Sequence, residues 1–416
     1  MMKYHFRCSD CGTEYHEPFL YLCPSCSFLN RDDRPPAGVL LTVYPYEKIA
    51  GKLSGQRLFD ELRLQHFLPL LPINSEESLG VLRVGNTPLY EAGHLAELPQ
   101  SARVLVKDDS QNPTFSFKDR ASQLVSAWAK EHDIHTIVTA STGNAGSSLA
   151  GICASQRQRA VVFAPATAPP AKLLQMVMYG ATTILVNGNY DAAFELSLKA
   201  TTHFGWFNRN TAYNPFTIEG KKIVAFELYQ QTCGKLPEYI FVPVGDGVIL
   251  SGLYKGFEDL LKLGIISHIP IVVAVQSEQS DNLVRNLDAD EFLIRPATTI
   301  ADSISVDVPR NFRMAAGFLK RYDGEHMTVS DESIAIAAEK LARTTGIFTE
   351  PAGAAAVAGL LKWIDEGRLK ADETALILAT GSGLKDICTP LKHVIMPEPI
   401  TPDLDSLIHY LNKTGS

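Results

Sequence analysis

Asn112-Pro113-Thr114-Phe115-Ser116-Phe117-Lys118-Asp119-Arg120 sets one lysine between two aromatic residues on a polar turn that leads into a predicted helix. Apolar neighbours and partial burial favour the neutral amine, which can condense with an aldehyde to form a Schiff base. Phe115 and Phe117 are the candidates for the apolar wall around Lys118. A solvated surface lysine beside its charged neighbours is the alternative interpretation, and the loops further along the chain help to decide between the two.

Three glycine-containing loops follow predicted strands. The apolar runs 136–138, 239–244 and 375–379 are typical of buried strands, and they lead into the loops 140–146, 245–252 and 380–386. A strand, a glycine loop and a helix N-terminus together can hold a phosphate group. Each loop alone is weak evidence, since the Rossmann spacing Gly-x-Gly-x-x-Gly with a later acidic residue is not met here. Together with Lys118 the loops strongly favour a ligand site.

The order of these motifs resembles that of fold-type II pyridoxal-phosphate enzymes and, within that group, the threonine synthase family. The matching pieces are Gly85-Asn86-Thr87-Pro88-Leu89, Ser116 to Arg120, Ser141-Thr142-Gly143-Asn144, Asn214 to Lys222, the Gly245 loop, Glu350-Pro351-Ala352 and Thr380-Gly381. The resemblance runs from about Gly85 to Pro390. The segment from Asn214 to Lys222 is its most discriminating piece.

The resemblance implies an α/β fold of the tryptophan synthase β type, in which two parallel-sheet domains hold the cofactor in the cleft between them. A large cofactor-binding domain is expected at residues 35–124 and 213–416, and a small mobile domain at residues 125–212. The strand runs expected from Gly85 onward are 104–106, 136–138, 160–163, 183–186, 240–242, 271–275 and 376–378. Helical segments alternate with them, which is typical of parallel sheets covered on both faces.

Residue roles carry over from the resemblance position by position. Lys118 is expected to form the Schiff base with pyridoxal phosphate and then to move protons at the substrate's carbons. Asn144 is expected to bond the ring hydroxyl of the cofactor. Thr380 is expected to face the pyridine nitrogen, where a hydroxyl makes the ring a weaker electron sink than a carboxylate does. The substrate carboxylate is expected on Ser141, Thr142, Gly143, Asn144 and Ala145, and the cofactor phosphate on Gly245, Asp246, Gly247, Val248 and Ile249.

For a threonine synthase the resemblance implies O-phospho-L-homoserine as the substrate. Proton removal at Cα and Cβ expels phosphate from Cγ, and water adds at Cβ to give L-threonine. Such a substrate needs at least one cation for its phosphate. The candidates are Lys172, Lys221, Lys222 and Arg310, each with a solvated surface position as the alternative.

Departures from the family pattern leave the reaction open. Ala145 lacks the hydroxyl usual after Gly-Asn, Ser382 stands where histidine is common, and Val248 is β-branched where glycine is usual. Asp246 puts a carboxylate beside the phosphate seat, so we expect it to turn away or to cap the next helix. One alternative is another fold-type II enzyme, either a serine or threonine dehydratase or a β-replacement enzyme such as a cysteate synthase. The other is a non-catalytic binding protein of the same fold, against which the intact Lys118 and Asn144 argue.

The N-terminal residues 1–34 carry a separate signal. Cys8, Cys11, Cys23 and Cys26 form two Cys-x-x-Cys pairs, a spacing typical of a short zinc ribbon. Four thiolates leave no open position for water, so the predicted zinc is structural. Two disulfides in a secreted protein, or vestigial cysteines, are the alternatives, but residues 1–7 hold no apolar stretch of signal-peptide length.

Composition bounds the remaining possibilities. The chain has 416 residues, of which 45% are hydrophobic and 20% charged, and these values are ordinary for a globular protein of two or three domains. A net charge of -8 gives no reason to expect nucleic acid as a partner. No apolar run approaches the roughly 20 residues that cross a bilayer, so no membrane partner is expected. We expect a cytoplasmic enzyme with a small amino-acid substrate, and the family suggests a homodimer.

Overall fold

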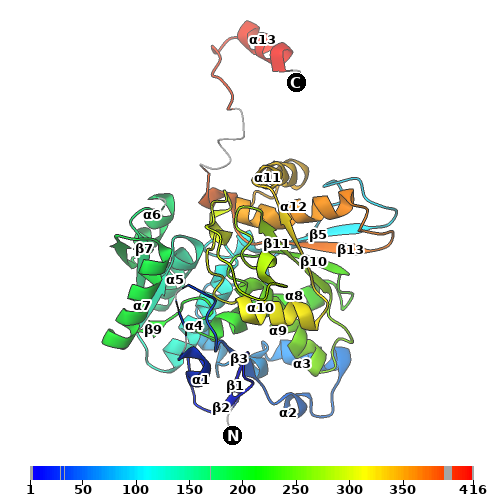
Figure 1. Cartoon of the computed structure of the whole chain (residues 1–416). Helices are drawn as coiled ribbons and strands as arrows, with labels where there is room; N and C mark the ends of the chain where they lie inside the picture. Colours follow the sequence, from blue (N-terminus) through cyan, green and yellow to red (C-terminus); the bar gives the residue numbers. More distant parts are fainter. Residues whose placement is uncertain (1–2, 29, 32, 169, 388–395, 415–416) are drawn as a thin grey trace.

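The computed structural model describes residues 3–28, 30–31, 33–168, 170–387 and 396–414. They form three β-sheets with helices around them (Figure 1). The strand runs expected from sequence are all found. No helix in the described part of the chain is both long enough and apolar enough to span a membrane.

A six-stranded sheet forms the larger body, in the order β12-β11-β10-β13-β5-β4. Its strands are β4 (Leu89–Glu91), β5 (Arg103–Asp108), β10 (Tyr239–Pro243), β11 (Ile271–Ser277), β12 (Glu325–Val329) and β13 (Thr374–Ala379). Neighbours from β12 to β5 pair in parallel, and β4 pairs antiparallel with β5. Parallel pairing brings the carboxyl ends of β10 and β13 to one edge, where the loops of Gly245 and Thr380 begin.

Helices cover both faces of this sheet. They are α8 (Phe216–Gln231), α9 (Val248–Lys262), α10 (Phe312–Arg321), α11 (Asp331–Thr345) and α12 (Pro351–Asp365). Ile240 and Val242 pack into the core shared with α8 and α9, whereas Phe241 packs into the core shared with α12. The strands are therefore apolar on both faces, because successive side chains of a strand point to opposite sides.

A four-stranded parallel sheet, in the order β8-β7-β6-β9, forms the smaller body at the left of Figure 1. Its strands are β6 (Thr136–Ala140), β7 (Arg159–Pro165), β8 (Thr182–Val186) and β9 (Phe207–Asn208). Helices α4 (Lys118–Glu131), α5 (Asn144–Gln156), α6 (Pro170–Met178) and α7 (Tyr190–Phe204) surround it. The four strands of this sheet lie within residues 125–212. That these residues form a domain of their own, and that it moves, stays a prediction.

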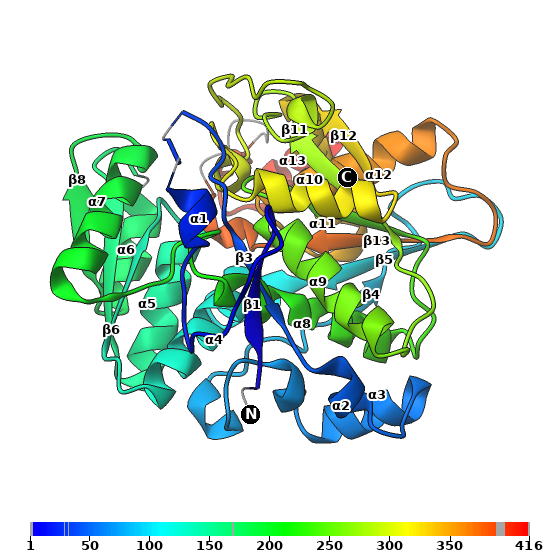
Figure 2. The ribbon, with the colours of Figure 1, turned by 60° about the horizontal axis from the view of Figure 1, so that its bottom comes forward.

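The N-terminal segment folds as a three-stranded antiparallel sheet, in the order β2-β1-β3, which Figure 2 shows beside α4 and α8. Its elements are β1 (His5–Cys8), β2 (Glu14–Tyr15), α1 (Pro24–Ser27) and β3 (Leu40–Val43), and α2 (Tyr46–Ala50) and α3 (Gly55–Leu64) follow. The strand β3 lies beyond residue 34, where the ribbon was expected to end. The last helix is α13 (Leu404–Thr414), and short 3-10 helices occur at Leu68–Leu70, Glu76–Leu79, Asp109–Gln111, Val284–Asn286, Asp302–Ile304 and Gly383–Lys385.

Arg120, at the end of the stretch that opens on Asn112, lies in a buried charge network. Its guanidinium donates to Asp109 at 2.6 and 2.9 Å and to Glu227 at 2.6 and 2.8 Å. Lys107 donates to the same Glu227 at 2.7 Å. The Arg120 side chain is 1% exposed, so a solvated surface segment is the wrong interpretation of this stretch. The network joins β5, α4 and α8 and thereby fixes the helix that starts at Lys118.

The segment from Asn214 to Lys222 builds a second buried network. Lys222 donates to Glu219 at 2.5 Å and to Asp259 of α9 at 2.7 Å, and the Tyr44 hydroxyl donates to Glu219 at 2.7 Å. Lys255 completes the network through an ion pair with Asp259. Glu219 and Lys222 therefore join α8 to α9 and to Tyr44, the residue that follows β3.

Candidate active site

Lys118 is the first residue of α4, and backbone hydrogen bonds hold the loop before it. The Phe117 amide donates to the Thr380 carbonyl at 2.8 Å, and the Ser382 amide donates to the Phe115 carbonyl at 3.0 Å. Phe117 is fully buried, as expected of an apolar wall. Phe115 is 45% exposed and has a left-handed φ of 67°, so its expected part in a buried wall was wrong.

The Lys118 side chain lines a cavity of about 180 Å³ between the two larger sheets. Burial lowers the pKa of Lys118, and the charge of Arg209 lowers it further, while Glu350 and Asp246 oppose the shift. A lowered pKa favours the neutral amine. The cavity is also lined by Ala140, Ser141, Thr142, Gly143, Asn144, Ala145, Tyr190, Thr211, Asp246, Asp302, Ser303, Ser305 and Val306. The structure thus brings Lys118 together with the whole predicted loop from Ser141 to Ala145.

Asn144 is held at the start of α5 by contacts across the cavity. Its Nδ2 donates to Glu350 Oε1 at 2.7 Å and to Ser303 Oγ at 3.1 Å. Its Oδ1 is buried and has no hydrogen-bond partner among the described residues. A buried acceptor without a partner carries a desolvation cost, so this atom is suited to a donor on a ligand.

The Gly245 loop leaves the N-terminus of α9 open. Gly247 precedes the helix with φ +87°, and a Cβ there would lie 2.9 Å from the Ala315 Cβ. A Cβ on Gly245 would lie 2.9 Å from the Ile304 Cα. Gly247 provides no side-chain cap, so amides at the start of α9 are available to an anion; Val248 and Ile249 form the first turn.

Asp246 does not cap α9. Its Oδ1 instead accepts the Arg310 amide at 3.0 Å, just before α10, and its own carbonyl accepts the Asn311 amide at 3.0 Å. Of the two alternatives expected for Asp246, the first therefore holds: the carboxylate turns away from α9 and does not cap it. Burial raises the pKa of Asp246.

Thr380 is buried, and its backbone carbonyl supports the Lys118 loop. It is not among the described residues that line the cavity. The expected contact of its hydroxyl with a pyridine nitrogen stays a prediction.

Sequence reasoning assigned no role to several groups at this site. Glu350 occurs in a matching motif, and the only signal in its favour is an acidic residue directly before the helix-starting Pro351. Tyr190 at the start of α7, Thr211 after β9, and Asp302, Ser303, Ser305 and Val306 in and after a 3-10 helix belong to no recognisable motif. No sequence motif pointed to Arg209, although its charge lowers the pKa of Lys118. Tertiary structure alone gathers these groups.

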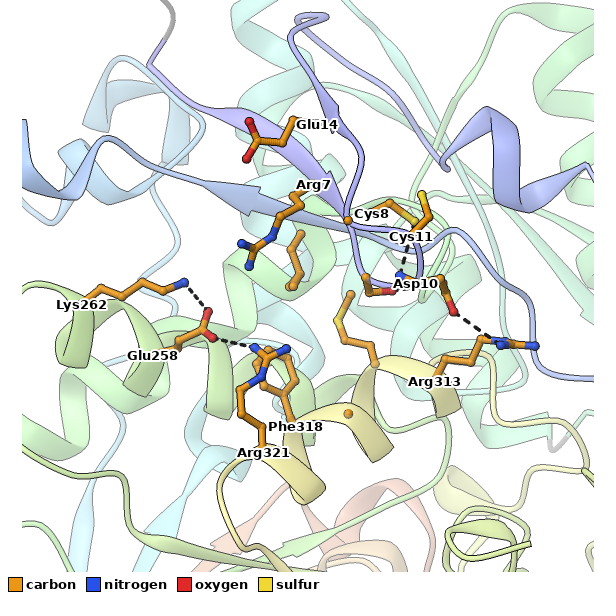
Figure 3. Close-up of a pocket in the computed structure, with 15 residues that line it drawn as sticks. Arg7, Cys8, Asp10, Cys11, Glu14, Glu258, Lys262, Arg313, Phe318 and Arg321 are labelled. Atoms are coloured by element: carbon orange, nitrogen blue, oxygen red, sulfur yellow. Dashed lines mark hydrogen bonds and ion pairs between the residues drawn. The ribbon is translucent and has the colours of Figure 1, made fainter. Parts of the chain in front are cut away.

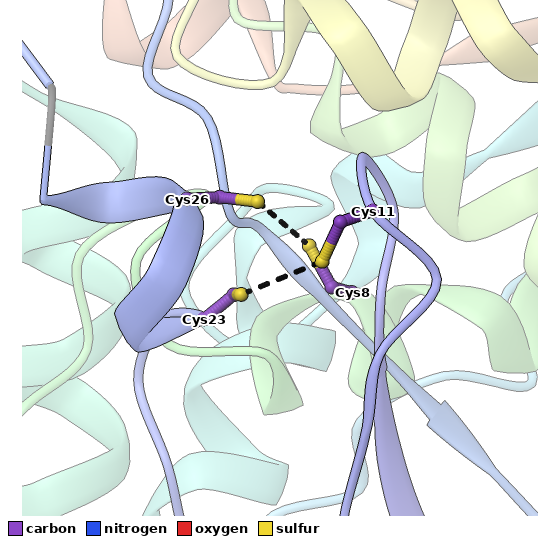
Figure 4. Close-up of side chains that lie close together, drawn as sticks. All are labelled: Cys8, Cys11, Cys23 and Cys26. Atoms are coloured by element: carbon purple, nitrogen blue, oxygen red, sulfur yellow. Dashed lines mark hydrogen bonds between the residues drawn. The ribbon is translucent and has the colours of Figure 1, made fainter.

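The four cysteines of the N-terminal segment converge, as Figure 4 shows. Their sulfur atoms all lie within 4.8 Å of one another, and the Cys8–Cys26 and Cys11–Cys23 pairs are each 3.8 Å apart. Thiolates bound tetrahedrally to zinc at about 2.3 Å have sulfur atoms about 3.8 Å apart. The geometry matches a four-cysteine metal site and not two disulfides, whose sulfurs are about 2.05 Å apart.

A larger hollow of about 740 Å³ lies between the cysteine segment and helices α9 and α10 (Figure 3). Its charged groups largely neutralise one another. Lys262 and Arg321 contact Glu258 at 2.8 and 3.0 Å, and Arg313 lies 3.6 Å from Asp10. None of the residues predicted to bind cofactor or substrate lines this hollow, whereas Lys118 and the loop from Ser141 to Ala145 line the smaller cavity.

Comparison with known proteins agrees with this geometry. The family model described as pyridoxal-phosphate dependent enzyme matches residues 81–381. The threonine synthase of Methanocaldococcus jannaschii is 32% identical over 98% of this chain and 99% of its own length. The threonine synthase of Methanosarcina acetivorans is 33% identical over 97% of this chain and 98% of its own length. The threonine synthase of Mycobacterium tuberculosis strain H37Rv is 33% identical over 80% of this chain and 91% of its own length.

Solved structures share the fold at lower identity. Threonine deaminase isoform 2 of Solanum lycopersicum superposes with a TM-score of 0.66 at 21% identity, covering 80% of this chain and 92% of that one. Maize serine racemase superposes with a TM-score of 0.63 at 19% identity, covering 79% of this chain and 92% of the racemase. These likenesses show the architecture alone.

Proposed function

Because this chain belongs to the family of pyridoxal-phosphate-dependent enzymes and is a lyase, we propose that it is a threonine synthase. The reaction is the conversion of O-phospho-L-homoserine and water to L-threonine and phosphate. The observation that carries the proposal is the near full-length match to two threonine synthases at 32% and 33% identity. The match to the first spans 413 residues and so includes nearly all of the cysteine-bearing segment.

The residues at the site fit pyridoxal phosphate. Lys118 offers an amine of lowered pKa, Asn144 offers an unpartnered Oδ1 to the ring hydroxyl, and the loop at Gly247 offers amides to the phosphate. The bound cofactor supplies an electron sink for negative charge at the substrate's carbons.

The chain's own groups would bind the substrate and move its protons. The loop from Ser141 to Ala145 precedes α5, so its amides and hydroxyls are suited to the substrate carboxylate. Lys118 would take protons from Cα and Cβ, since burial favours its neutral form. Glu350 and Asp246 raise the pKa of the same amine, so it can also hold a proton between steps. Movement of residues 125–212 toward the rest of the chain would exclude water.

A dehydratase acting on serine or threonine is the second candidate. Asp246 favours it, because a carboxylate lines the cavity where a phosphorylated substrate would be repelled. β-Replacement, as in a cysteate synthase, is a further possibility within the same family.

A substrate panel tests the proposal. Wild-type protein with added cofactor is incubated with O-phospho-L-homoserine, O-phospho-L-serine, L-serine and L-threonine, and phosphate, 2-oxo acid, ammonia and amino-acid products are measured. Equal amounts of phosphate and threonine from O-phospho-L-homoserine support threonine synthase. Keto acid and ammonia from serine or threonine, without threonine synthesis, contradict it in favour of a dehydratase.

We propose that Cys8, Cys11, Cys23 and Cys26 bind one structural zinc ion. The double variant Cys8→Ser, Cys26→Ser should lose that ion, because two thiolates are removed from a four-ligand site. Metal analysis of freshly purified protein should give one zinc per chain in the wild type and none in the variant. Cys233→Ser, at an exposed cysteine outside the cluster, is the control that should keep the ion. Wild-type protein without zinc would refute the assignment.

A further inference from the structure

The segment that carries the four cysteines contacts the chain where it leaves the smaller body. Residues 207–214, which we call the crossover, lead from β9 toward α8 and so from the smaller body to the larger one. The Asn208 amide donates to the Tyr21 hydroxyl at 2.8 Å. The Tyr21 ring stacks on Tyr213, with 4.4 Å between the ring centroids. Tyr21 therefore contacts both ends of the crossover.

The backbone beside Tyr21 is fixed at the cysteine cluster. Cys23, two residues after Tyr21, is one of the four cysteines that converge in Figure 4. Its amide donates to the Gly38 carbonyl at 2.8 Å, and Leu22 forms a β-bridge with Val39. A zinc ion bound to Cys23 would restrain this backbone further, because binding a metal orders the loops that carry its ligands.

Hydrogen bonds continue from the crossover to the wall of the cavity around Lys118. Asn208 Oδ1 accepts the Asn210 amide at 2.7 Å, and Asn210 Oδ1 accepts the Ala140 amide at 2.7 Å. Ala140 and Thr211 line the cavity. Both asparagines are buried, so water competes poorly for these bonds. Three successive hydrogen bonds thus connect Tyr21 to the cavity wall.

Aromatic packing attaches the same segment to the two larger bodies without using the cysteines. The ring centroid of Phe19 lies 4.9, 5.0 and 5.3 Å from those of Phe207, Trp128 and Phe216. Such contacts between large apolar rings do not depend on a metal. Removal of the metal should therefore leave the segment attached and loosen chiefly the loops that carry the cysteines and Tyr21.

We propose that Tyr21 is a positioning residue that couples metal binding at the four cysteines to ligand binding in the Lys118 cavity. This deepens the proposed function and rests on its structural zinc, but it holds for whichever amino acid reacts. With the metal bound, Tyr21 keeps the crossover ordered, so a ligand that contacts the cavity wall has less conformational freedom to remove. Linkage is reciprocal, so the ligand must raise the affinity for zinc by the same factor.

Ligand titrations measure this coupling. Holoenzyme, before and after zinc removal with a chelator, is titrated with L-threonine and with O-phospho-L-serine, and cofactor absorbance reports binding. Zinc removal should weaken binding about 5-fold or more, the lower end of allosteric coupling. Tyr21→Phe should keep the zinc and weaken binding by a similar factor, because the bond to Asn208 is lost. Zinc removal from Tyr21→Phe should then have little further effect.

The reciprocal measurement is zinc affinity, determined by competition with the chelator. Bound ligand should raise the zinc affinity of the wild type by the same factor and leave that of Tyr21→Phe unchanged. Tyr229→Phe is the matched control, because the Tyr229 hydroxyl also bonds a distant residue, Gln56, at 3.0 Å. Tyr229 lies in α8 beyond the crossover, so this variant should keep the wild-type coupling.

Hydrogen exchange separates positioning from general stabilisation. In zinc-free wild type and in Tyr21→Phe, peptides that cover residues 207–214 and 139–143 should exchange faster, whereas peptides from β10 and β11 should keep their protection. Faster exchange throughout the protein, without a change in ligand affinity, would show that Tyr21 is only structural and contradict the proposal.

Two further outcomes would overturn the coupling. One is a ligand affinity that zinc removal does not change, and the other is a Tyr21→Phe protein that keeps the full response to zinc. Purified wild-type protein without zinc would refute the metal assignment and the coupling with it. Products other than threonine in the substrate panel would refute the proposed reaction and leave the coupling standing, because either ligand reports on the same cavity.

Discussion

Lys118→Ala should reduce turnover by at least about 10³-fold, because it removes both the amine that forms the Schiff base and the group that moves protons at the substrate's carbons. Purified wild-type protein should absorb visible light through the bound cofactor, and the variant should lose the absorbance of the lysine-linked form. Absorption spectra and steady-state turnover on the active member of the substrate panel measure the two effects.

The matched control for this variant is Lys130→Ala, at the other end of α4. Lys130 is exposed and donates only to the Glu77 carbonyl at 3.4 Å. Its removal should leave both the spectrum and turnover near wild-type values. A Lys118→Ala protein that keeps the wild-type spectrum and turnover would exclude Lys118 as the Schiff-base lysine. A wild-type protein that stays colourless after purification with added cofactor would exclude the cofactor chemistry altogether.

Arg120→Met should lower the free energy of unfolding by about 3–5 kcal/mol, the range measured when one partner of a buried ion pair is removed. The reason is that Asp109 and Glu227 would stay buried with much of their charge uncompensated. Urea unfolding followed by circular dichroism measures the change. The control is Arg103→Met, which breaks the pair with Glu91 at 3.1 Å; both of those side chains are more than half exposed, so about 1 kcal/mol or less is expected. Equal losses in the two variants would contradict the stabilising role of the buried network.

The same network determines a pH dependence of stability. Burial alone would raise the pKa of Glu227, but Arg120 and Lys107 outweigh it and lower that pKa from 4.5 to about 2. The stabilisation is therefore present above about pH 4.5 and is lost as the pH falls from there toward 2. The acid limb of the stability curve should accordingly be shallower in Glu227→Gln than in the wild type.

The two buried networks change how the sequence motifs are understood. Asp119 and Arg120 follow Lys118 directly, but both are buried and bonded within the protein, Asp119 to Thr114 and Arg120 to Asp109 and Glu227. Glu219 and Lys222 likewise bond to groups of α9 and Tyr44. A motif can therefore discriminate one family from another through the packing around a site, without contact between its charged residues and the substrate.

Several features were predictable from sequence because they are local. The strand runs such as 240–242 are short and apolar, the cysteine pairs have a characteristic spacing, and the loop from Ser141 to Ala145 starts a helix. The structure places that loop beside Lys118 and brings the cysteines together, as expected. The part of Phe115 in a buried wall was predicted wrongly, and the sequence left open whether Asp246 turns away or caps the next helix, because both depend on groups that only folding brings near.

By itself, the sequence determined the alternation of strands and helices, the glycine loops at strand ends and the cysteine cluster, and it predicted Lys118 as the Schiff-base lysine, because each depends on residues close together in the chain. Only the tertiary structure decided which buried charges are compensated. Arg120 donates to Glu227 across 107 positions of sequence, whereas the two terminal nitrogens of Arg209 have no hydrogen-bond partner among the described residues. The cost of a buried charge depends on partners that folding brings together, and for that reason spacing along the chain could not distinguish these two arginines.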